Sequence, residues 1–215
     1  MTAIGQRRTL LMAVILSLIA GCSLPVPQQS TAKRTYLLQG NQEPDPARAA
    51  VSRSCVILRI STPGSAPGFM TSRMAYTKTP QRLDYFAYHE WVDTPARMIA
   101  SLIEGRLDSA SMFGAVVSGS SDVRADFRLD SEVTRLLQDF DAEGSKVILK
   151  VKVNLINVSS RSLLSSRSFS YAETSNGSNP EAGVAAANHA AERFLVDLMG
   201  FVAESIGPID CSQPD

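Results

Sequence analysis

The first 22 residues constrain the fold most, because they separate the start of the chain from whatever folds afterwards. Two arginines at positions 7 and 8 form a short basic region, and an apolar run interrupted by one serine follows over residues 10–20. Two small residues then lead directly into Cys22. The apolar run is too short to span a bilayer, and this arrangement is typical of a secretory signal. We therefore expect residues 1–21 to be removed, so that the mature chain begins at Cys22.

The segment Ile19-Ala20-Gly21-Cys22 resembles the lipobox of a bacterial lipoprotein signal. Its small residues admit the active site of a peptidase, and Cys22 supplies the thiol that is acylated. The alternatives are an ordinary signal peptide and an uncleaved anchor. Several acyl chains on one residue hold a protein stably on a membrane, whereas a single chain holds it marginally. Ser23 is not the aspartate associated with retention in the inner membrane, which favours the periplasmic face of the outer membrane.

Length and charge set further limits on the mature chain. Removing 21 residues from 215 leaves 194, enough for one domain with a sizeable core. The signal carries two arginines and no acid, so the mature chain has 19 basic residues (21 − 2) and 21 acidic ones, a net charge of −2. This balance gives no electrostatic case for binding nucleic acid. We predict a tether over residues 22–35, a domain over 36–207 and a tail over 208–215.

Two cysteines remain once Cys22 is acylated, namely Cys55 and Cys211. An even number of cysteines in an oxidising compartment suggests a disulfide between them. Two unrelated thiols are the alternative. The polar tail around Cys211 has little else to hold it, which favours the bridge.

Hydrophobic periodicity predicts strands and helices in alternation. Residues 126–133 and 146–157 alternate apolar and polar side chains, and the short loop between them predicts antiparallel pairing. A further strand is expected over 163–173. Apolar residues recur at helical spacing after Thr94-Pro95 and again after Asn179-Pro180. The order of these elements predicts one α+β domain with a mostly antiparallel sheet and two main helices packed on it.

Two details of these elements are specific enough to check. A loop centred near Ala142 would place Glu132 opposite Lys152 and Thr134 opposite Lys150, which alternates acid and base on the exposed face. Thr94 is of the residue type that caps the first helix with its side chain.

The densest aromatic cluster, LDYFAYHEW, occupies residues 83–91. Its residues either pack the sheet or form an apolar surface that docks a partner or lipid chains. We favour packing for Trp91, the only tryptophan, because it directly precedes the first helix. Tyr85 and Tyr88 are open between the two roles, and their parity places them on opposite faces of the strand. All three are candidates for contact with a partner or lipid.

Signals for catalysis or cofactor binding are missing from the sequence. His89 and His189, the only histidines, are 100 positions apart and have no carboxylate or cysteine array at metal-ligand spacing. There is no G-x-S-x-G nucleophile motif and no phosphate-binding loop. We therefore predict no metal, no cofactor and no enzyme activity.

The run from Tyr85 to Phe113, with its Trp91-x-Asp93-x-Pro95 pattern and amphipathic helix, resembles the ABC-type transport auxiliary lipoproteins, the paraquat-inducible protein C-like group. Further fitting pieces lie at 36–38, 67–76 and 125–129. The resemblance implies an accessory lipoprotein that works with a transporter ATPase, a permease and a membrane-anchored substrate-binding protein of the mammalian-cell-entry type. Its implied cargo is lipid or another hydrophobic molecule moving between the two membranes. The family provides no catalytic residue to carry over.

Two other functions stay open at this point. The chain could be a structural lipoprotein that helps another envelope complex assemble, or a small lipid-carrying lipoprotein that holds an acyl chain itself. A closed apolar cavity between helix and sheet would favour the carrier. The sequence also leaves open whether the chain self-associates as a homo-oligomer.

Overall fold

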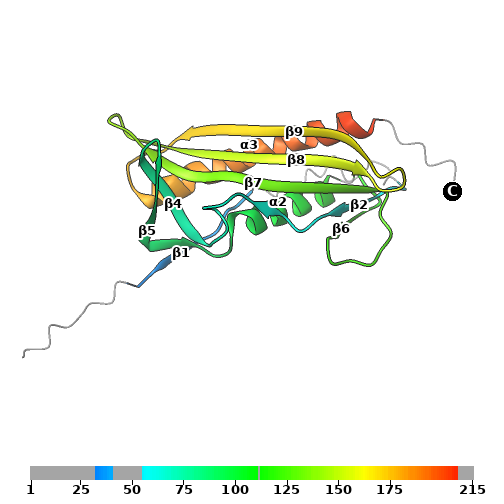
Figure 1. Ribbon diagram of the computed structural model, residues 1–215, viewed down its shortest axis with the longest axis horizontal. Coiled ribbons are helices and arrows are strands. Elements are labelled where there is room, and N and C mark those ends of the chain that lie inside the picture. The colour runs from blue at the N-terminus through cyan, green and yellow to red at the C-terminus, as the bar shows by residue number, and fades with distance from the viewer. Residues whose placement is uncertain (1–31, 41–54, 111, 208–215) are drawn as a thin grey trace, which may run out of the picture. The chain divides into compact units, whose positions relative to one another are not determined.

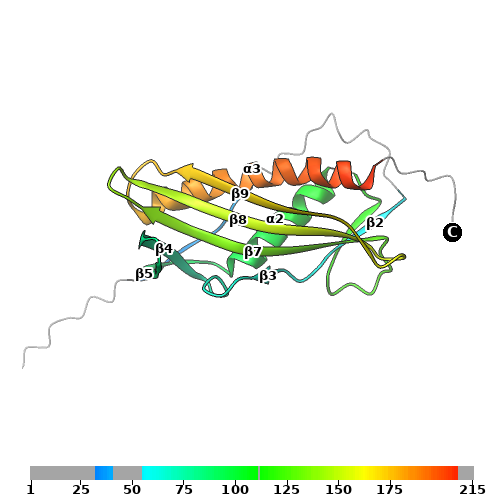
Figure 2. The same ribbon diagram turned by 45° about the horizontal axis from the view of Figure 1, so that its top comes forward.

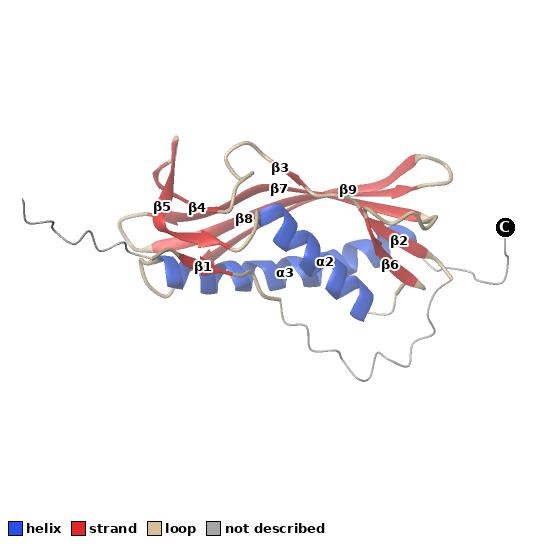
Figure 3. Cartoon of the chain, turned by 90° about the horizontal axis from the view of Figure 1, so that it is seen from below, coloured by secondary structure: helices blue, strands red, loops and turns tan. Residues whose placement is uncertain are grey.

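The computed structural model describes residues 32–40, 55–110 and 112–207 (Figure 1). The chain divides into two units, Met1–Ala32 and Lys33–Asp215, and the described strands and helices belong to the second. Among the described residues, nine strands form one mixed sheet, and two helices cover one of its faces (Figures 2 and 3). The α+β fold predicted from the sequence is confirmed.

The sheet is built around one long central strand. Its strands are β1 (Arg34–Tyr36), β2 (Ile57–Ile60), β3 (Gly64–Ser65), β4 (Arg73–Thr79), β5 (Arg82–Trp91), β6 (Ala115–Ser118), β7 (Phe127–Phe140), β8 (Ser145–Asn157) and β9 (Ser162–Thr174). The order is β1-β5-β4-β7-β2-β6, and β8 joins β7 to β9, so that β1 and β9 lie at opposite edges. The β7–β8 and β8–β9 pairings are long and antiparallel, whereas β7 pairs in parallel with β2, β3 and β4.

A bulge in β7 corrects one of the two predicted residue pairs. Glu132 lies opposite Lys152 as expected, but Arg135 rather than Thr134 lies opposite Lys150, because the register shifts between Val133 and Arg135. Without the extra residue, Arg135 would face the helices beside the buried Leu149. The bulge instead returns Leu136 to the core opposite Leu149 and leaves Arg135 exposed. The apolar pattern, which resumes one residue late, therefore sets the register.

The helices α2 (Pro95–Ser109) and α3 (Pro180–Ile206) begin where the sequence predicts. Asn179 caps α3 by accepting a hydrogen bond from the Ala182 amide at 2.8 Å, and Gly207, at a φ of 68°, ends it. Thr94 holds the N-cap position of α2, but its side chain makes no capping hydrogen bond. The predicted capping role of the Thr94 side chain is therefore wrong.

The core lies between the sheet and the two helices. Small residues on α3 let the helix approach the sheet closely, and large ones fill the space further along, where the Phe169 and Phe194 rings meet edge to face at 5.4 Å. The fully buried side chains include Leu58, Ile99, Ile103, Leu129, Leu149, Ala190, Ala191, Phe194 and Leu198. No helix among the described residues is both long and apolar enough to cross a membrane.

The space between sheet and helices beside Trp91 is nearly filled. The cavity bordered by Met74, Trp91, Leu136, Gln138 and Gly183 measures about 10 Å³, which is roughly the room of one water molecule. This part of the described core therefore has no room for an acyl chain, which weakens the lipid-carrying alternative.

Gly183 is required where α3 crosses the buried Gln138. A methyl group at position 183 would clash with the Gln138 amide, which is held by donating to Ser145 Oγ at 2.8 Å and to the Asn179 carbonyl at 3.1 Å. Gly183→Ala should therefore lower the free energy of unfolding by about 1–3 kcal/mol, in spite of alanine's better helix propensity. Urea unfolding at neutral pH measures the change.

Gly200 supplies the matched control on the same helix. Nothing lies within 4 Å of a methyl group added there, so Gly200→Ala should raise the free energy of unfolding by up to about 1 kcal/mol. Equal effects of the two substitutions would refute the clash with Gln138.

Candidate functional site

The predicted lipidation and disulfide sites fall mainly outside the described residues. Cys22 and Cys211 are both outside them, whereas Cys55 begins the second described segment. The acylation of Cys22 and the Cys55–Cys211 disulfide therefore remain predictions.

The three aromatic candidates on β5 have different surroundings. Trp91, at 4 % exposure, is buried against the helices, and this supports its packing role. Tyr88 is 51 % exposed. Tyr85 is half-buried in a second apolar cluster with Phe69 and Leu137.

Tyr85 is held in place by a hydrogen bond and a cation–π contact. Its hydroxyl donates a hydrogen bond to the Gly68 carbonyl at 2.8 Å, and the Arg73 guanidinium lies 4.0 Å from the centre of its ring. These contacts fasten β5 to the loop before β4 and to the first residue of β4, so Tyr85 helps to shape this part of the sheet.

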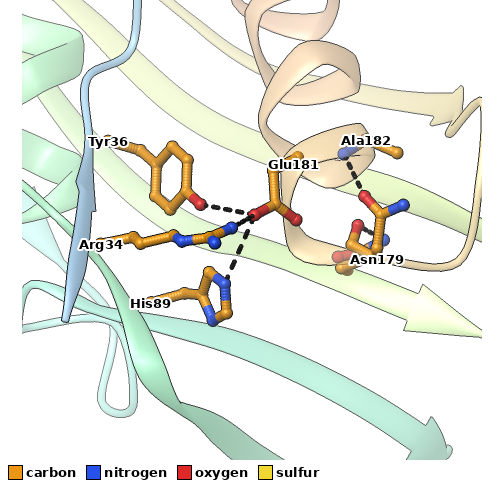
Figure 4. Close-up of polar contacts among 7 residues, drawn as sticks. Arg34, Tyr36, His89, Asn179, Glu181 and Ala182 are labelled. Carbon is orange, nitrogen blue, oxygen red and sulfur yellow. Dashed lines mark hydrogen bonds and ion pairs between the residues drawn. The ribbon is translucent and has the colours of Figure 1, made fainter. Parts of the chain in front are cut away.

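A polar cluster joins β1 to the start of α3 (Figure 4). Arg34 Nη1 donates to Glu181 Oε1 at 2.6 Å, and the Tyr36 hydroxyl donates to the same oxygen at 3.0 Å. His89 Nε2, from the neighbouring β5, lies 3.6 Å from it. One carboxylate thus holds the edge strand β1 and its neighbour β5 to the helix, and we call these four residues the Glu181 clamp.

The Glu181 clamp is anchored by the backbone as well as by side chains. Glu181 lies in the first turn of α3, where the helix dipole favours a negative charge. Its own backbone amide, then the Tyr36 hydroxyl and the Arg34 guanidinium, lower the pKa of Glu181 to about 2. Burial and the hydrogen bond to Glu181 raise the pKa of Tyr36. The clamp therefore keeps Glu181 charged and Tyr36 neutral at neutral pH.

Acid should weaken the Glu181 clamp. Because the folded-state pKa of Glu181 is about 2 and its ordinary value is 4.5, the stabilisation is complete above pH 4.5 and is lost as the pH falls towards 2. At pH 7, Glu181→Gln should lower the free energy of unfolding by up to about 1 kcal/mol, since the clamp is partly exposed. Urea unfolding of both proteins across this range should show their stabilities converging in acid. A difference that stays constant with pH would contradict the assignment.

Aromatic rings of β5 and its neighbouring strands pack against the Glu181 clamp. The Tyr36 and His89 rings stack with their centres 5.9 Å apart, and Phe86 meets His89 edge to face at 5.9 Å. Phe86 in turn packs on Tyr76 at 4.6 Å. His89 is therefore a packed residue of this cluster, and its ring joins the polar clamp to the apolar rings.

Two surface depressions among the described residues are open to solvent and have mixed polar and apolar walls. One of about 440 Å³ lies beside α3 and includes His189, Glu192 and Arg193. Another of about 470 Å³ lies between α2 and the loops that follow β2 and β6. No group of three His, Cys, Asp or Glu side chains in the described part of the chain could hold a metal ion.

The sequence did not reveal the Glu181 clamp, because its members come from three distant segments. Arg34 and Glu181 are 147 positions apart. The local signals were an arginine before a short apolar run and an acidic residue in a first helical turn, and both are common. What the clamp can do is mechanical: it fixes the first strand of the domain to its longest helix.

Most of the chain matches one known protein family. The profile of a family described as the ABC-type transport auxiliary lipoprotein component matches residues 36–198, more than half of the chain. No curated protein matches the chain.

Two solved structures have a similar fold. One, of a Xanthomonas campestris protein, is 20 % identical with a TM-score of 0.69, covering 80 % of this chain and 96 % of that one. Another, of an uncharacterized protein, is 12 % identical with a TM-score of 0.62 and covers 80 % and 99 %. At these identities the likeness concerns the fold alone.

Proposed function

We propose, because the chain belongs to the ABC-type transport auxiliary lipoprotein family, that it serves as a lipid-anchored accessory subunit of a transport system in the bacterial envelope. The observation that carries the proposal is the extent of the family match. It runs from Tyr36 in the first strand to Leu198 in the last helix. The accessory role therefore concerns the whole sheet-and-helix body rather than one motif.

The proposed anchor is Cys22, at the periplasmic face of the outer membrane. The lipobox over residues 19–22 supports acylation, and Ser23 supports export past the inner membrane. Cys22 lies 12 positions before Arg34, which at about 3.3 Å per residue limits the reach of the tether to roughly 40 Å. The Glu181 clamp lies where this tether joins the body, so it would transmit any pull from the membrane to α3.

The proposed partners are an ABC permease, its ATPase and a substrate-binding protein of the mammalian-cell-entry type, moving lipid or another hydrophobic cargo between the membranes. ATP hydrolysis would take place in the ATPase, and this chain would dock and organise the assembly without catalysing a reaction. An assembly role in another envelope complex is the main alternative. The small size of the cavity beside Trp91 supports docking over carriage of lipid by this chain.

Affinity purification tests this function directly. The full-length protein with a C-terminal tag should recover the permease, the ATPase and the cell-entry protein from gently solubilised membranes. A matched control joins residues 1–35 to an unrelated soluble domain, which keeps the signal, lipobox and tether but removes the family domain. Recovery of the same proteins with this control, or of a different envelope complex with the full-length chain, would contradict the proposal.

We also propose that Cys55 and Cys211 form a disulfide that ties the tail to the start of β2. Peptide mapping without reduction, on protein taken from the periplasmic side of the membrane, should recover a peptide pair linked through these cysteines. Free thiols at both positions would contradict the link.

A further inference from the structure

Two exposed apolar side chains lie together where the first strand ends. Leu37 is 52 % exposed and Val92 is 56 % exposed. They come directly after the paired residues Tyr36 and Trp91, and the Val92 amide donates to the Tyr36 carbonyl at 2.7 Å. Leu37 and Val92 are therefore neighbours at the ends of two adjacent strands.

Both side chains point away from the helices. Tyr36 reaches Glu181 on α3 and Trp91 is buried in the core, whereas the residue after each of them is more than half exposed, which places Leu37 and Val92 on the other side. Lys33 and Glu90 lie on that side too, since each precedes a helix-facing residue and the two form an ion pair at 2.9 Å. We call the surface of Lys33, Leu37, Glu90 and Val92 the β1–β5 outer face.

Further exposed apolar residues lie close to this surface along the chain. Tyr88 precedes Glu90 by two positions and is 51 % exposed. Met70, at 65 % exposure, comes two residues before Ser72, whose carbonyl accepts a hydrogen bond from the Trp91 amide. Exposed apolar residues grouped beside charged ones are typical of an interaction surface.

The position of this surface in the chain indicates what it contacts. Lys33, whose side chain belongs to the β1–β5 outer face, is only 11 positions after Cys22. The bilayer that holds an acylated Cys22 is therefore within about 36 Å of this surface, at roughly 3.3 Å per residue. Lysine and tyrosine beside aliphatic residues also suit a membrane interface, where their polar ends reach water and their apolar parts contact lipid.

We infer that the β1–β5 outer face rests on the lipid bilayer to which the protein is anchored, an inference that depends on the acylation of Cys22 proposed above. The tether then limits how far the domain can move from the membrane, and Leu37 and Val92 contact lipid. The sheet edge formed by β9 and the exposed face of α3 are left for protein partners.

Photocrosslinking of the full-length, processed protein tests this contact. A benzoylphenylalanine probe is introduced at Leu37 or Val92, and the protein is reconstituted into vesicles of phosphatidylethanolamine and phosphatidylglycerol. Matched control probes replace Leu163 on β9, at 59 % exposure, and Val196 on α3, at 56 %. The probes at Leu37 and Val92 should form roughly tenfold more lipid adduct than the controls, because only side chains held at the membrane reach the lipid.

A second pair of variants separates contact from folding. Leu37→Glu should reduce the lipid adduct of a probe at Val92, whereas Leu163→Glu should not, and both proteins should keep the thermal unfolding midpoint of the parent. Equal lipid labelling at all four probe positions, or a discrete protein adduct at Leu37 and Val92 in intact cells, would overturn the inference.

The mass of the N-terminal peptide distinguishes these results from a failure of the anchor. An unacylated Cys22 would refute the proposed anchor and this inference together, whereas an acylated Cys22 without lipid adducts would refute the inference alone.

Discussion

Trp91→Ala is expected to lower the free energy of unfolding by about 3–5 kcal/mol, as loss of a large buried aromatic side chain generally does. Trp91 is 4 % exposed and borders the small space between sheet and helices with Met74, Leu136 and Val147. It also ends β5 directly opposite Tyr36. Its removal would enlarge that space and loosen the attachment of β1. Urea unfolding of the purified proteins measures the effect.

Tyr88→Ala on the same strand is the matched control for this prediction. Tyr88 is 51 % exposed, so its truncation should change stability by far less. If the two substitutions cost the same, Trp91 would not hold the corner between sheet and helix. Any loss of transport in Trp91→Ala should follow the loss of folded protein.

Cys22→Ser is expected to abolish acylation and to leave the signal uncleaved by the lipoprotein peptidase. Serine has no thiol to be acylated. The precursor would therefore stay uncleaved, and the mature N-terminus would not form. Growth with a fatty-acid analogue should label the parent protein and leave the variant unlabelled. In addition, the variant should keep the mass of residues 1–21.

Cys55→Ser provides the control for this experiment, because it removes a cysteine elsewhere in the chain. It should be labelled as strongly as the parent. Equal labelling of Cys22→Ser and the parent would show that the lipid is attached at another residue, and the proposed anchor would be wrong.

Local patterns in the sequence were enough to predict the elements whose partners follow closely along the chain. The starts of both helices and the β7–β8–β9 meander were predicted, including Glu132 opposite Lys152. The bulge at Thr134 was not, because it depends on which of two registers buries Leu136 and keeps Arg135 in water. That choice involves the side chains of β8 and the helices together, and no single segment contains it.

Pairings between distant segments were the other part that the sequence did not reveal. β2 pairs in parallel with both β6 and β7, and β1 pairs with β5, through contacts that no local period encodes. The candidate site was missed for the same reason. Trp91 was correctly favoured as a packing residue, whereas Glu181, which joins Arg34, Tyr36 and His89, gave no more signal than any acidic residue at the start of a helix.

The long sequence separation within the Glu181 clamp has a consequence for the order of events during maturation. A chain exported from its N-terminus presents Cys22 and β1 first, but Glu181 follows Arg34 by 147 positions and emerges near the end. The β7–β8–β9 meander has local contacts and can form early, whereas β1 must wait for partners that close a long loop. We therefore expect β1 to dock late, after Cys22, the proposed acylation site, has become accessible to the acylating enzymes.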